Sequence, residues 1–443
     1  MIDGEHYPPV VLDAMRTIED SMNAEGVAAA FLGGTEKLKE GTDYGVPLVM
    51  GTDPVSAVER ALAEHSVDVV FDLSDEPVIG YRERMRIASM VLAAGARYRG
   101  SDFDLRPPDL RPVSTKPSLA VIGTGKRVGK TAISGYLARL LAREGFDPGV
   151  VSMGRGGPPH PEVIEGHKLE VGSEYLLEAL ERGAHAASDY YETAALSRVT
   201  TVGCRRCGGG LAGEPFVSNV LEGAEIANSL DTGITVFDGS GAAVPPVAVD
   251  RRILVAGAHQ DPEYIAGFLG AYRLLISDLL LTMSEEPMAD EAKVEGIVEA
   301  VREVKPELEA IPAVFRPRPV GNVEGLRVAY VSTAPPAVLR KLADHLQDRH
   351  GCEVVAASGN LSDRRRLAED LDAMSGVEAY LTEIKAAAVD VVTRRGAGEG
   401  KPVFYCDNEP LGEGIDGALL RLAREAVAGA GAPGGGRSRS RGV

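Results

Sequence analysis

The amino-acid sequence predicts an α/β protein with a central parallel sheet, a small α/β domain before it and further α/β structure after it. Two observations carry this prediction. Short apolar runs alternate with helical stretches along most of the 443 residues, as expected for parallel strands joined by helical crossovers. One apolar run, at 119–122, leads into a glycine-rich loop, and a helical pattern at 132–144 follows that loop directly.

The first 112 residues have a pattern of their own. Apolar runs at 27–32, 46–50 and 67–73 predict strands, and the stretches at 55–65 and 81–94 predict helices. The proline-rich segment 105–112 then interrupts the pattern. Residues 1–112 are therefore expected to fold as a small N-terminal α/β domain.

The rest of the chain continues the alternation. A central domain is expected at 113–285, with strands at 119–122, 146–151, 234–237 and 253–256 and a buried strand within 274–283. A C-terminal α/β region at 286–426 has predicted helices at 291–304, 337–349 and 363–374, and predicted strands at 311–315, 327–331, 353–357, 377–381 and 403–406. Residues 427–443 lack apolar periodicity and are predicted to be a disordered tail.

The loop after the run at 119–122 has the composition of a nucleotide phosphate-binding loop. Its backbone N–H groups and the helix N-terminus can hold a polyphosphate, Lys130 can reach the outer phosphates, and the Thr131 hydroxyl can bind Mg²⁺. Thr124 stands where the usual G-x4-G-K-[ST] pattern has its first glycine, so the spacing is G-x5-G-K-T. A structural turn is the alternative to this interpretation. The favoured prediction is a phosphate-loop NTPase domain that binds ATP through Gly123, Thr124, Gly125, Lys126, Arg127, Val128, Gly129, Lys130 and Thr131.

Composition limits the classes of function. No apolar run approaches the roughly 20 residues needed to span a bilayer. The N-terminus is acidic and has no signal-peptide pattern, and the 4 cysteines do not make a disulfide framework, so a cytoplasmic location is expected. The net charge of −18, the lack of tryptophan and the 5% aromatic content argue against nucleic-acid and acidic-membrane partners. An anionic substrate would therefore need a local basic pocket.

Two further segments carry charges suited to a phosphate site. Asp238 ends the apolar run at 234–237 and precedes Gly-Ser-Gly; such a carboxylate can anchor the Mg²⁺ shell, and we favour this role over capping of a turn. Arg155 lies in a glycine-rich loop after the run at 146–151. Its guanidinium could clamp an anion, and an exposed loop arginine is the equal alternative.

The segment Cys204-Arg-Arg-Cys207 precedes three glycines and invites two interpretations. C-x2-C can be half a zinc site or a redox pair. Cys352 and Cys406, however, lie far away in other apolar runs, and no histidine pair is near. We therefore interpret the segment as a basic loop in which Arg205 and Arg206 meet phosphates.

Two acidic segments have less decisive patterns. His185 and Asp189 lie four residues apart, so one could orient the other on a helix, although the residues alone favour a surface pair over a catalytic pair. No Gly-x-Ser-x-Gly elbow supports a serine hydrolase. The segment 72–77, Asp-Leu-Ser-Asp-Glu-Pro, could bind a metal or a hydroxyl, but an acidic turn is the favoured interpretation.

Longer segments resemble the cyclic 2,3-diphosphoglycerate synthetase family, within the branch of phosphate-loop enzymes that includes dethiobiotin synthetase. The resemblance is carried by the phosphate loop and by Met-Gly-Arg-Gly-Gly-Pro (153–158), His-Ala-Ala-Ser-Asp (185–189), Thr-Val-Gly-Cys-Arg-Arg-Cys-Gly-Gly-Gly (201–210) and Gly-Ser-Gly-Ala-Ala-Val-Pro-Pro (239–246). It runs from about Phe31 through Cys406, and Cys-Arg-Arg-Cys-Gly-Gly-Gly is its most distinctive part.

This resemblance implies an ATP-dependent closure of 2,3-bisphosphoglycerate into a ring with an internal phosphoanhydride, by a homodimer that releases ADP and phosphate. Lys130, Lys126, Arg127 and a Mg²⁺ held by Thr131 and Asp238 would then neutralise the ATP phosphates. The substrate phosphates would be gathered by Arg155, Arg205 and Arg206. The candidate catalytic residues are Lys130, Arg155, Arg205, Arg206, His185 and Asp189.

Two other functions share some of these features. A different ATP-dependent kinase or ligase acting on a small phosphorylated acid would use the same loop. A nucleotide-switched, partner-binding ATPase would also use it, and Cys-x-x-Cys would suit metal delivery by such a protein. That class places a signature lysine where this chain has Gly125, with Lys126 one residue away.

Overall fold

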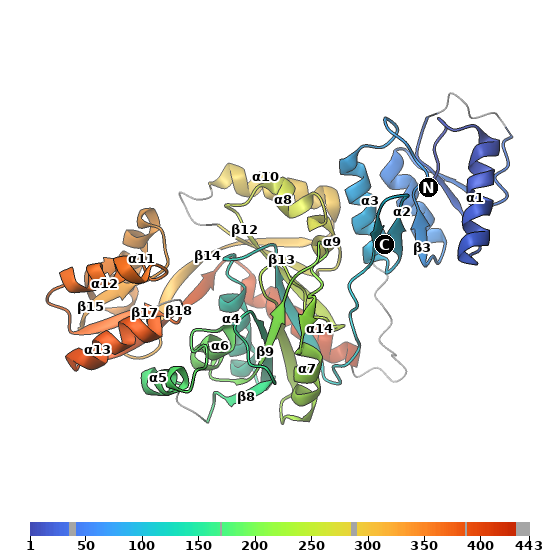
Figure 1. Ribbon diagram of the computed structural model, residues 1–443. Helices are drawn as coiled ribbons and strands as arrows, with labels where there is room; N and C mark the ends of the chain where they lie inside the picture. The colour runs from blue at the N-terminus through green and yellow to red at the C-terminus, as the bar shows by residue number, and fades with distance from the viewer. Residues whose placement is uncertain (35–40, 169–170, 285–289, 386–387, 431–443) are drawn as a thin grey trace.

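The computed structural model describes residues 1–34, 41–168, 171–284, 290–385 and 388–430. Figure 1 shows the N-terminal domain, in blue, at one end of the molecule and the C-terminal lobe, in orange and red, at the other. The phosphate-loop domain lies between them. None of the described helices is both long and apolar enough to cross a membrane.

The N-terminal domain is a small doubly wound unit. Its first residues run as a strand between β1 and β3, because Ile2 bridges Phe31 in parallel and the Leu73 N–H donates to the Met1 carbonyl. The strand order is therefore β2-β1-(1–3)-β3-β4-β5. The strands are β1 (Ala29–Phe31), β2 (Leu48–Met50), β3 (Val69–Phe71), β4 (Arg97–Arg99) and β5 (Asp104–Leu105), and the helices are α1 (Pro8–Met22), α2 (Pro54–Glu64) and α3 (Tyr81–Ala93).

The acidic segment 72–77 is held by bonds within this domain. Asp72 accepts hydrogen bonds from the Ser74 N–H at 3.0 Å and the Tyr98 hydroxyl at 2.6 Å, and it pairs with Arg84 at 3.3 Å. The Asp75 N–H donates to the buried Asp3 carboxylate at 2.7 Å. These contacts support the interpretation of the segment as a turn.

The phosphate-loop domain is built on a parallel sheet with the order β9-β7-β11-β6-β12-β13-β14. Its central strands, such as β6 and β13, read as continuous apolar runs because both faces of the sheet are covered. They are β6 (Ser118–Gly123), β7 (Pro148–Gly154), β9 (Thr200–Cys207), β11 (Ile234–Asp238), β12 (Arg251–Gly257), β13 (Leu279–Met283) and β14 (Glu309–Pro319). Two short strands, β8 (Glu162–Glu165) and β10 (Val217–Ser218), pair antiparallel with β9 along the edge that β7 leaves open.

Helices cover both faces of this sheet. One face packs against α4 (Lys130–Arg143) and α14 (Ile415–Ala430), and α6 (Asp189–Ser197) lies against α4. The other face packs against α7 (Val220–Ser229), α9 (Gly270–Leu275) and α10 (Glu291–Val304), with α8 (Pro262–Ala266) beside α9. The remaining helix of this domain is α5 (Ser173–Glu181). In Figure 1 the red α14 returns from the C-terminal lobe to the phosphate-loop domain.

The sheet continues without a break into the C-terminal lobe. The second half of β14 pairs antiparallel with β18 (Val403–Leu411), and the order then runs β18-β17-β15-β16 in parallel. The other strands are β15 (Arg327–Val331), β16 (Glu353–Ser358) and β17 (Ala379–Glu383), and the helices are α11 (Pro336–His350), α12 (Arg364–Ala373), a π-helix at Ala388–Thr393 and α13 (Arg394–Glu399).

The structure confirms the predicted fold class and most of the predicted elements. The elements that had no prediction include the helices α1, α5, α6, α7, α8, α9 and α13, the π-helix, and the strands β4, β5, β8, β9 and β10. α1 fully buries only one apolar side chain, that of Val11. Of the predicted tail, residues 427–430 are helical in α14, and 431–443 lie outside the described residues. The boundaries at 112, 285 and 426 stay predictions.

Candidate active site

The phosphate loop joins β6 to α4 at the carboxyl edge of the parallel sheet. Lys126 and Arg127 are exposed at its tip, whereas Gly123, Thr124, Gly125 and Val128 are buried. The helix begins at Lys130, with Gly129 as its N-cap. The backbone N–H groups of the first turn of α4 have no partners within the helix and can bind an anion.

The unusual spacing of the loop has a structural explanation. A β-carbon at position 123 would lie 2.6 Å from Cδ of Lys130, so the glycine leaves room for the lysine side chain. Thr124 is buried, its N–H donates to the Val255 carbonyl at 3.1 Å, and its hydroxyl donates to Oε1 of Gln260. Thr124 thus fastens the loop to β12 and to the segment that follows it.

Gly129 is the least replaceable residue of the loop, and Gly129→Ala is expected to disable it. Its φ of +94° lies in the left-handed region, which costs an L-residue roughly 1–2 kcal/mol. An added β-carbon would also lie 2.2 Å from the Phe315 ring. We expect ATP affinity to fall at least about tenfold, measured by titration calorimetry. Gly145→Ala, which has a similar φ of +80° and open space around it, is the control and should retain ATP affinity.

Lys130 is buried inside the loop, with 7% of its surface exposed. Its Nζ donates to the Gly125 carbonyl at 2.8 Å. Burial lowers the pKa of Lys130, and the nearby carboxylates of Asp238 and Asp189 oppose that shift. A polyphosphate would supply the negative charge that this buried ammonium lacks.

Asp238 has a free oxygen beside this lysine. It is 1% exposed, and its Oδ1 accepts a hydrogen bond from the Ser134 hydroxyl at 2.8 Å. Its Oδ2 has no hydrogen-bond partner among the described residues, and burial raises the pKa of the carboxyl. A buried, unpartnered carboxylate oxygen fits the oxygen-only preference of Mg²⁺, and the Thr131 side chain is half-buried on the helix that carries Ser134. The sequence prediction missed Ser134, which lies three residues after Thr131 on the same helix face.

Two arginines converge at the start of the loop that follows β11. Arg206 donates to the Ser240 carbonyl at 2.7 Å and to the Gly208 carbonyl at 2.8 Å. A β-carbon at position 241 would lie 2.6 Å from Nη2 of Arg155 and 3.1 Å from Nη2 of Arg206. Burial and then the charge of Arg155 lower the pKa of Arg206. Two like charges held this close have the electrostatics suited to binding an anion.

His185 and Asp189 lie at the same edge, but not on one helix. Asp189 is the first residue of α6, and His185 precedes that helix, so the two residues are not an i,i+4 pair on a helix. A β-carbon at position 154 would lie 3.5 Å from Oδ2 of Asp189, and one at 156 would lie 3.0 Å from the His185 ring. Burial raises the pKa of Asp189, and Lys130 opposes the shift most strongly.

The Cys-Arg-Arg-Cys segment is the end of strand β9, so its prediction as a loop is wrong. Side chains alternate between the two faces of a strand. Arg206 therefore shares a face with the buried Cys204, and Arg205 shares the opposite face with the exposed Cys207. The two cysteines therefore face apart and do not form half of a zinc site. The Arg205 guanidinium makes no hydrogen bond or ion pair with a residue that the structure describes. The structure thus brings Lys130, Asp238, Asp189, Arg155 and Arg206 together and leaves Arg205 apart.

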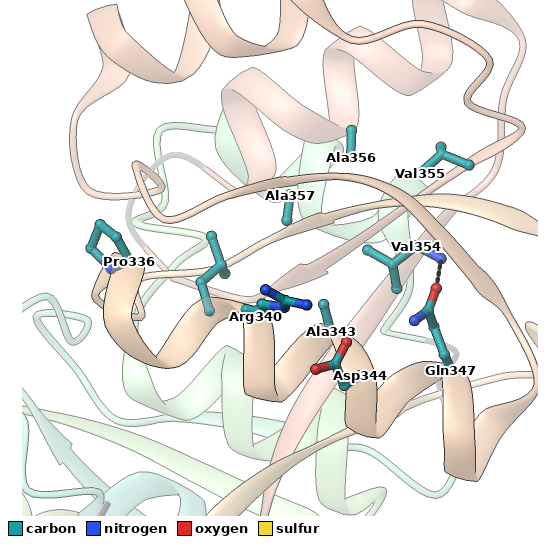
Figure 2. A pocket seen from close by; sticks show the side chains of 10 residues that line it. Pro336, Arg340, Ala343, Asp344, Gln347, Val354, Val355, Ala356 and Ala357 are labelled. Atoms are coloured by element: carbon teal, nitrogen blue, oxygen red, sulfur yellow. Dashed lines mark hydrogen bonds between the residues drawn. The ribbon is translucent and has the colours of Figure 1, made fainter. Parts of the chain in front are cut away.

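A hollow of about 410 Å³ lies elsewhere, between α11 and the edge strand β16. Figure 2 shows Arg340, Asp344 and Gln347 from the helix facing Val354 on the strand, and the Val354 N–H donates to Gln347 at 3.1 Å. None of the residues that line this hollow belongs to the charged cluster around the phosphate loop. The convergent charges therefore identify the candidate site, and the volume of this hollow does not.

Comparison with protein families gives three adjoining matches. Residues 1–106 match the N-terminal domain of cyclic 2,3-diphosphoglycerate synthetase, residues 118–314 match its P-loop domain, and residues 319–409 match its C-terminal domain. These matches follow one another in the order of the three lobes described above.

Several curated proteins are similar over the whole length. The cyclic 2,3-diphosphoglycerate synthetase of Rubrobacter xylanophilus is 76% identical over 100% of this chain and 99% of its own length. The synthetase of Methanothermus fervidus is 46% identical over 96% of each chain. A crystal structure of LpxK from Aquifex aeolicus in complex with ATP aligns with a TM-score of 0.40 and 16% identity over 69% of this chain and 88% of that one.

Proposed function

The chain belongs to the cyclic 2,3-diphosphoglycerate synthetase family and is an ATP-dependent synthetase, and from this premise we propose that it closes 2,3-bisphosphoglycerate into cyclic 2,3-diphosphoglycerate. ATP is the second substrate, and ADP and phosphate are the other products. A homodimer and a cytoplasmic location belong to the same proposal.

One observation supports the proposal above the others: the convergence of Arg155 and Arg206 over Gly241, beside a buried phosphate-loop lysine. Joining two phosphate groups of one molecule requires overcoming the repulsion between two dianions. The two arginines together with Lys130 provide three positive charges that can offset this repulsion. The surrounding chain carries a net charge of −18, so these cations serve a local site and not a general attraction for anions.

A two-step route accounts for the products without a protein nucleophile. One phosphate of the substrate attacks the γ-phosphorus of ATP, which forms a diphosphate on the substrate and releases ADP. An oxygen of the other substrate phosphate then attacks the inner phosphorus of that diphosphate and expels inorganic phosphate. The new P–O–P bond closes the ring. A phosphoenzyme at His185, together with no detectable diphosphorylated intermediate, would overturn this order of steps.

The residues of the chain have separate tasks in this route. Lys130 and the N-terminus of α4 would hold the outer ATP phosphates, and Arg155 and Arg206 would hold the substrate phosphates against each other. Thr131 and Asp238 would hold a Mg²⁺ that offsets charge on the ATP phosphates. Asp189 would keep the neighbouring cations in position, because its carboxylate attracts both Lys130 and Arg155.

The two neighbouring arginines of β9 should differ in function. We expect Arg206→Ala to raise the KM for 2,3-bisphosphoglycerate about 10- to 100-fold, the usual effect of losing a charge-assisted hydrogen bond, and to change the KM for ATP far less. Arg205→Ala is the matched control, and we expect less than about a threefold change because its side chain points to the opposite face. Steady-state kinetics with each substrate varied in turn would measure both. A larger effect of Arg205→Ala would contradict the placement of the substrate site.

The reaction itself is tested by measuring ADP and phosphate with two acceptors and without an acceptor. With 2,3-bisphosphoglycerate we expect ADP and phosphate in equal amounts. With 2-phosphoglycerate, or with no acceptor, we expect neither above a slow background. ADP without phosphate from 2-phosphoglycerate would identify a kinase, and ATP turnover independent of any acceptor would identify a switch ATPase; either would overturn the proposal.

A further inference from the structure

Helix α6 lies between the phosphate-loop sheet and the C-terminal lobe, and almost all of it is buried. Tyr190 to Ser197 are all buried, and the helix packs against α4, β7, β9 and β18. One apolar cluster joins its residues Tyr190 and Tyr191 to Ile384 and Tyr405 of the C-terminal lobe. The C-terminal lobe is therefore packed directly onto the helix whose first residue, Asp189, belongs to the candidate active site.

Two carboxylates lie on one face of α6. Asp189 and Glu192 are at positions i and i+3 of the helix, the spacing of neighbours on a helix surface. Burial raises the pKa of both, and the charge of Asp189 adds to the shift of Glu192. A buried acidic pair of this kind requires cations close to it.

The C-terminal lobe supplies one of these cations. Lys385 follows β17, and its Nζ lies 3.5 Å from Oε1 of Glu192. The Glu192 charge, as the largest cause, raises the pKa of Lys385 despite the desolvation that its partial burial imposes, and Asp189 contributes to the same shift. Asp189 is thus attracted both by Lys385 from the C-terminal lobe and by Lys130 from the phosphate loop.

Lys385 retains capacity to bind a ligand. The side chain of Lys385 is 34% exposed, whereas that of Glu192 is 7% exposed, so the lysine and not the glutamate is open to solvent. An ammonium group has three donors, and Glu192 takes one of them. The neighbouring Glu383 does not need Lys385 as its partner, because its carboxylate accepts hydrogen bonds from Ser332, Thr333 and Asn408, each at 3.1 Å.

We propose that Lys385 is a substrate-binding residue that the C-terminal lobe contributes to the active site. In the chain without ligand, Glu192 holds its ammonium group; when the acidic substrate binds, the ammonium donates to a substrate phosphate. The ligand class is a small organic bisphosphate, which carries more negative charge than Arg155 and Arg206 together can neutralise. This inference rests on the proposed function, and it gives the C-terminal lobe a direct part in the chemistry.

The test compares Lys385→Met with the wild-type chain and with Lys401→Met, a lysine of the same lobe that pairs with the exposed Glu399. We expect Lys385→Met to raise the KM and the calorimetric Kd for 2,3-bisphosphoglycerate about 10- to 100-fold and to leave the KM for ATP within about threefold. Lys385→Arg, which keeps the charge, should recover most of the loss. Lys401→Met should match the wild type.

Glu192→Gln distinguishes a substrate-binding role of Lys385 from a purely structural role, in which its ion pair with Glu192 only holds the C-terminal lobe on α6. If Glu192 only holds Lys385 until the substrate takes its place, the glutamine variant should bind 2,3-bisphosphoglycerate at least as tightly as the wild type, because a competing negative charge is gone. If the ion pair only holds the lobes together, its loss should instead weaken substrate binding in both Lys385→Met and Glu192→Gln. Weaker binding by Glu192→Gln, or an unchanged KM in Lys385→Met while the wild type cyclises normally, would overturn this inference alone. A wild-type chain that fails to cyclise the substrate would overturn the proposed function.

Discussion

Lys130→Ala should lower kcat by at least about a hundredfold to a thousandfold, the size of effect seen when one preorganised charge is removed from a reacting group. The ammonium of Lys130 is the only cation that the phosphate loop buries among its described residues, and Nζ is held against the loop by the Gly125 carbonyl. Lys126 and Arg127 are exposed and cannot replace it. Steady-state turnover of ATP in the presence of 2,3-bisphosphoglycerate measures the loss.

The fold should survive this change. Removing a buried ammonium also removes its desolvation cost, and Thr124 still fastens the loop to β12. We therefore expect the Tm of Lys130→Ala to stay within a few degrees of the wild type, by circular dichroism or calorimetry. Lys168→Ala, a surface lysine paired with Glu165, is the control and should keep full activity. Residual turnover in Lys130→Ala near the wild-type rate would contradict the assignment of the loop as the ATP site.

The second large effect concerns Asp238. In Asp238→Asn, a neutral amide replaces the carboxylate whose Oδ2 has no partner in the described part of the chain. An amide is a weaker ligand for Mg²⁺, so we expect kcat to fall about a hundredfold or more and the Mg²⁺ concentration for half-maximal rate to rise. The Ser134 hydroxyl can still donate to the amide oxygen, so the fold should be retained. Asp231→Asn, an exposed carboxylate just before β11, is the control and should behave as the wild type.

The same residue predicts a pH dependence of the metal requirement. Burial raises the pKa of Asp238, so protons compete with Mg²⁺ closer to neutrality than at an ordinary carboxylate. As pH falls the carboxyl becomes protonated, and the Mg²⁺ concentration for half-maximal rate should rise between about pH 8 and pH 6. Asp238→Asn has no such proton and should show a weaker pH dependence, the one that the titrating phosphates of ATP and substrate impose. A wild-type profile no steeper than that of Asp238→Asn would contradict the metal role of Asp238.

Local sequence patterns were sufficient to predict those parts of the candidate site that consist of one strand and the residues directly after it. The run at 119–122, the glycine-rich loop and the following helical pattern predicted β6, the phosphate loop and α4 within two residues. Asp238 could be found because a carboxylate directly after a buried strand lies at the edge where parallel strands end. Fold class followed from the same alternation of apolar runs and helices.

The sequence pattern gave a wrong prediction for the segment that mixes small, polar and charged residues, which was predicted as a loop and is a strand. Residues 200–207 contain two threonines, a glycine, two cysteines and two arginines, so no apolar run marks β9. The segment forms a strand because β7 pairs with it along six residues. The burial of β9 is set by its tertiary neighbours and not by its own composition. Since the segment is a strand, its two arginines point to opposite faces, and only Arg206 joins Arg155. The spacing of His185 and Asp189 likewise does not place them on one helix, because α6 begins at Asp189.

Contacts between distant segments could not be predicted from the chain alone. Gln260, which accepts from Thr124, and Phe315, which lies against Gly129, have no local pattern that marks them as neighbours of the loop. Lys385 is separated from Glu192 by nearly 200 residues, and it reaches α6 only because the sheet continues through β14 and β18 into the C-terminal lobe. Such residues are placed by sheet order, which a single sequence does not fix.

The proposed reaction is tested most directly by ³¹P NMR of the purified protein with Mg-ATP and 2,3-bisphosphoglycerate. We expect a new upfield phosphoanhydride resonance to grow together with the resonances of ADP and inorganic phosphate, as the two phosphate monoester signals of the substrate disappear. Formation of ADP without the phosphoanhydride resonance would contradict the cyclisation and would identify a kinase or an uncoupled ATPase.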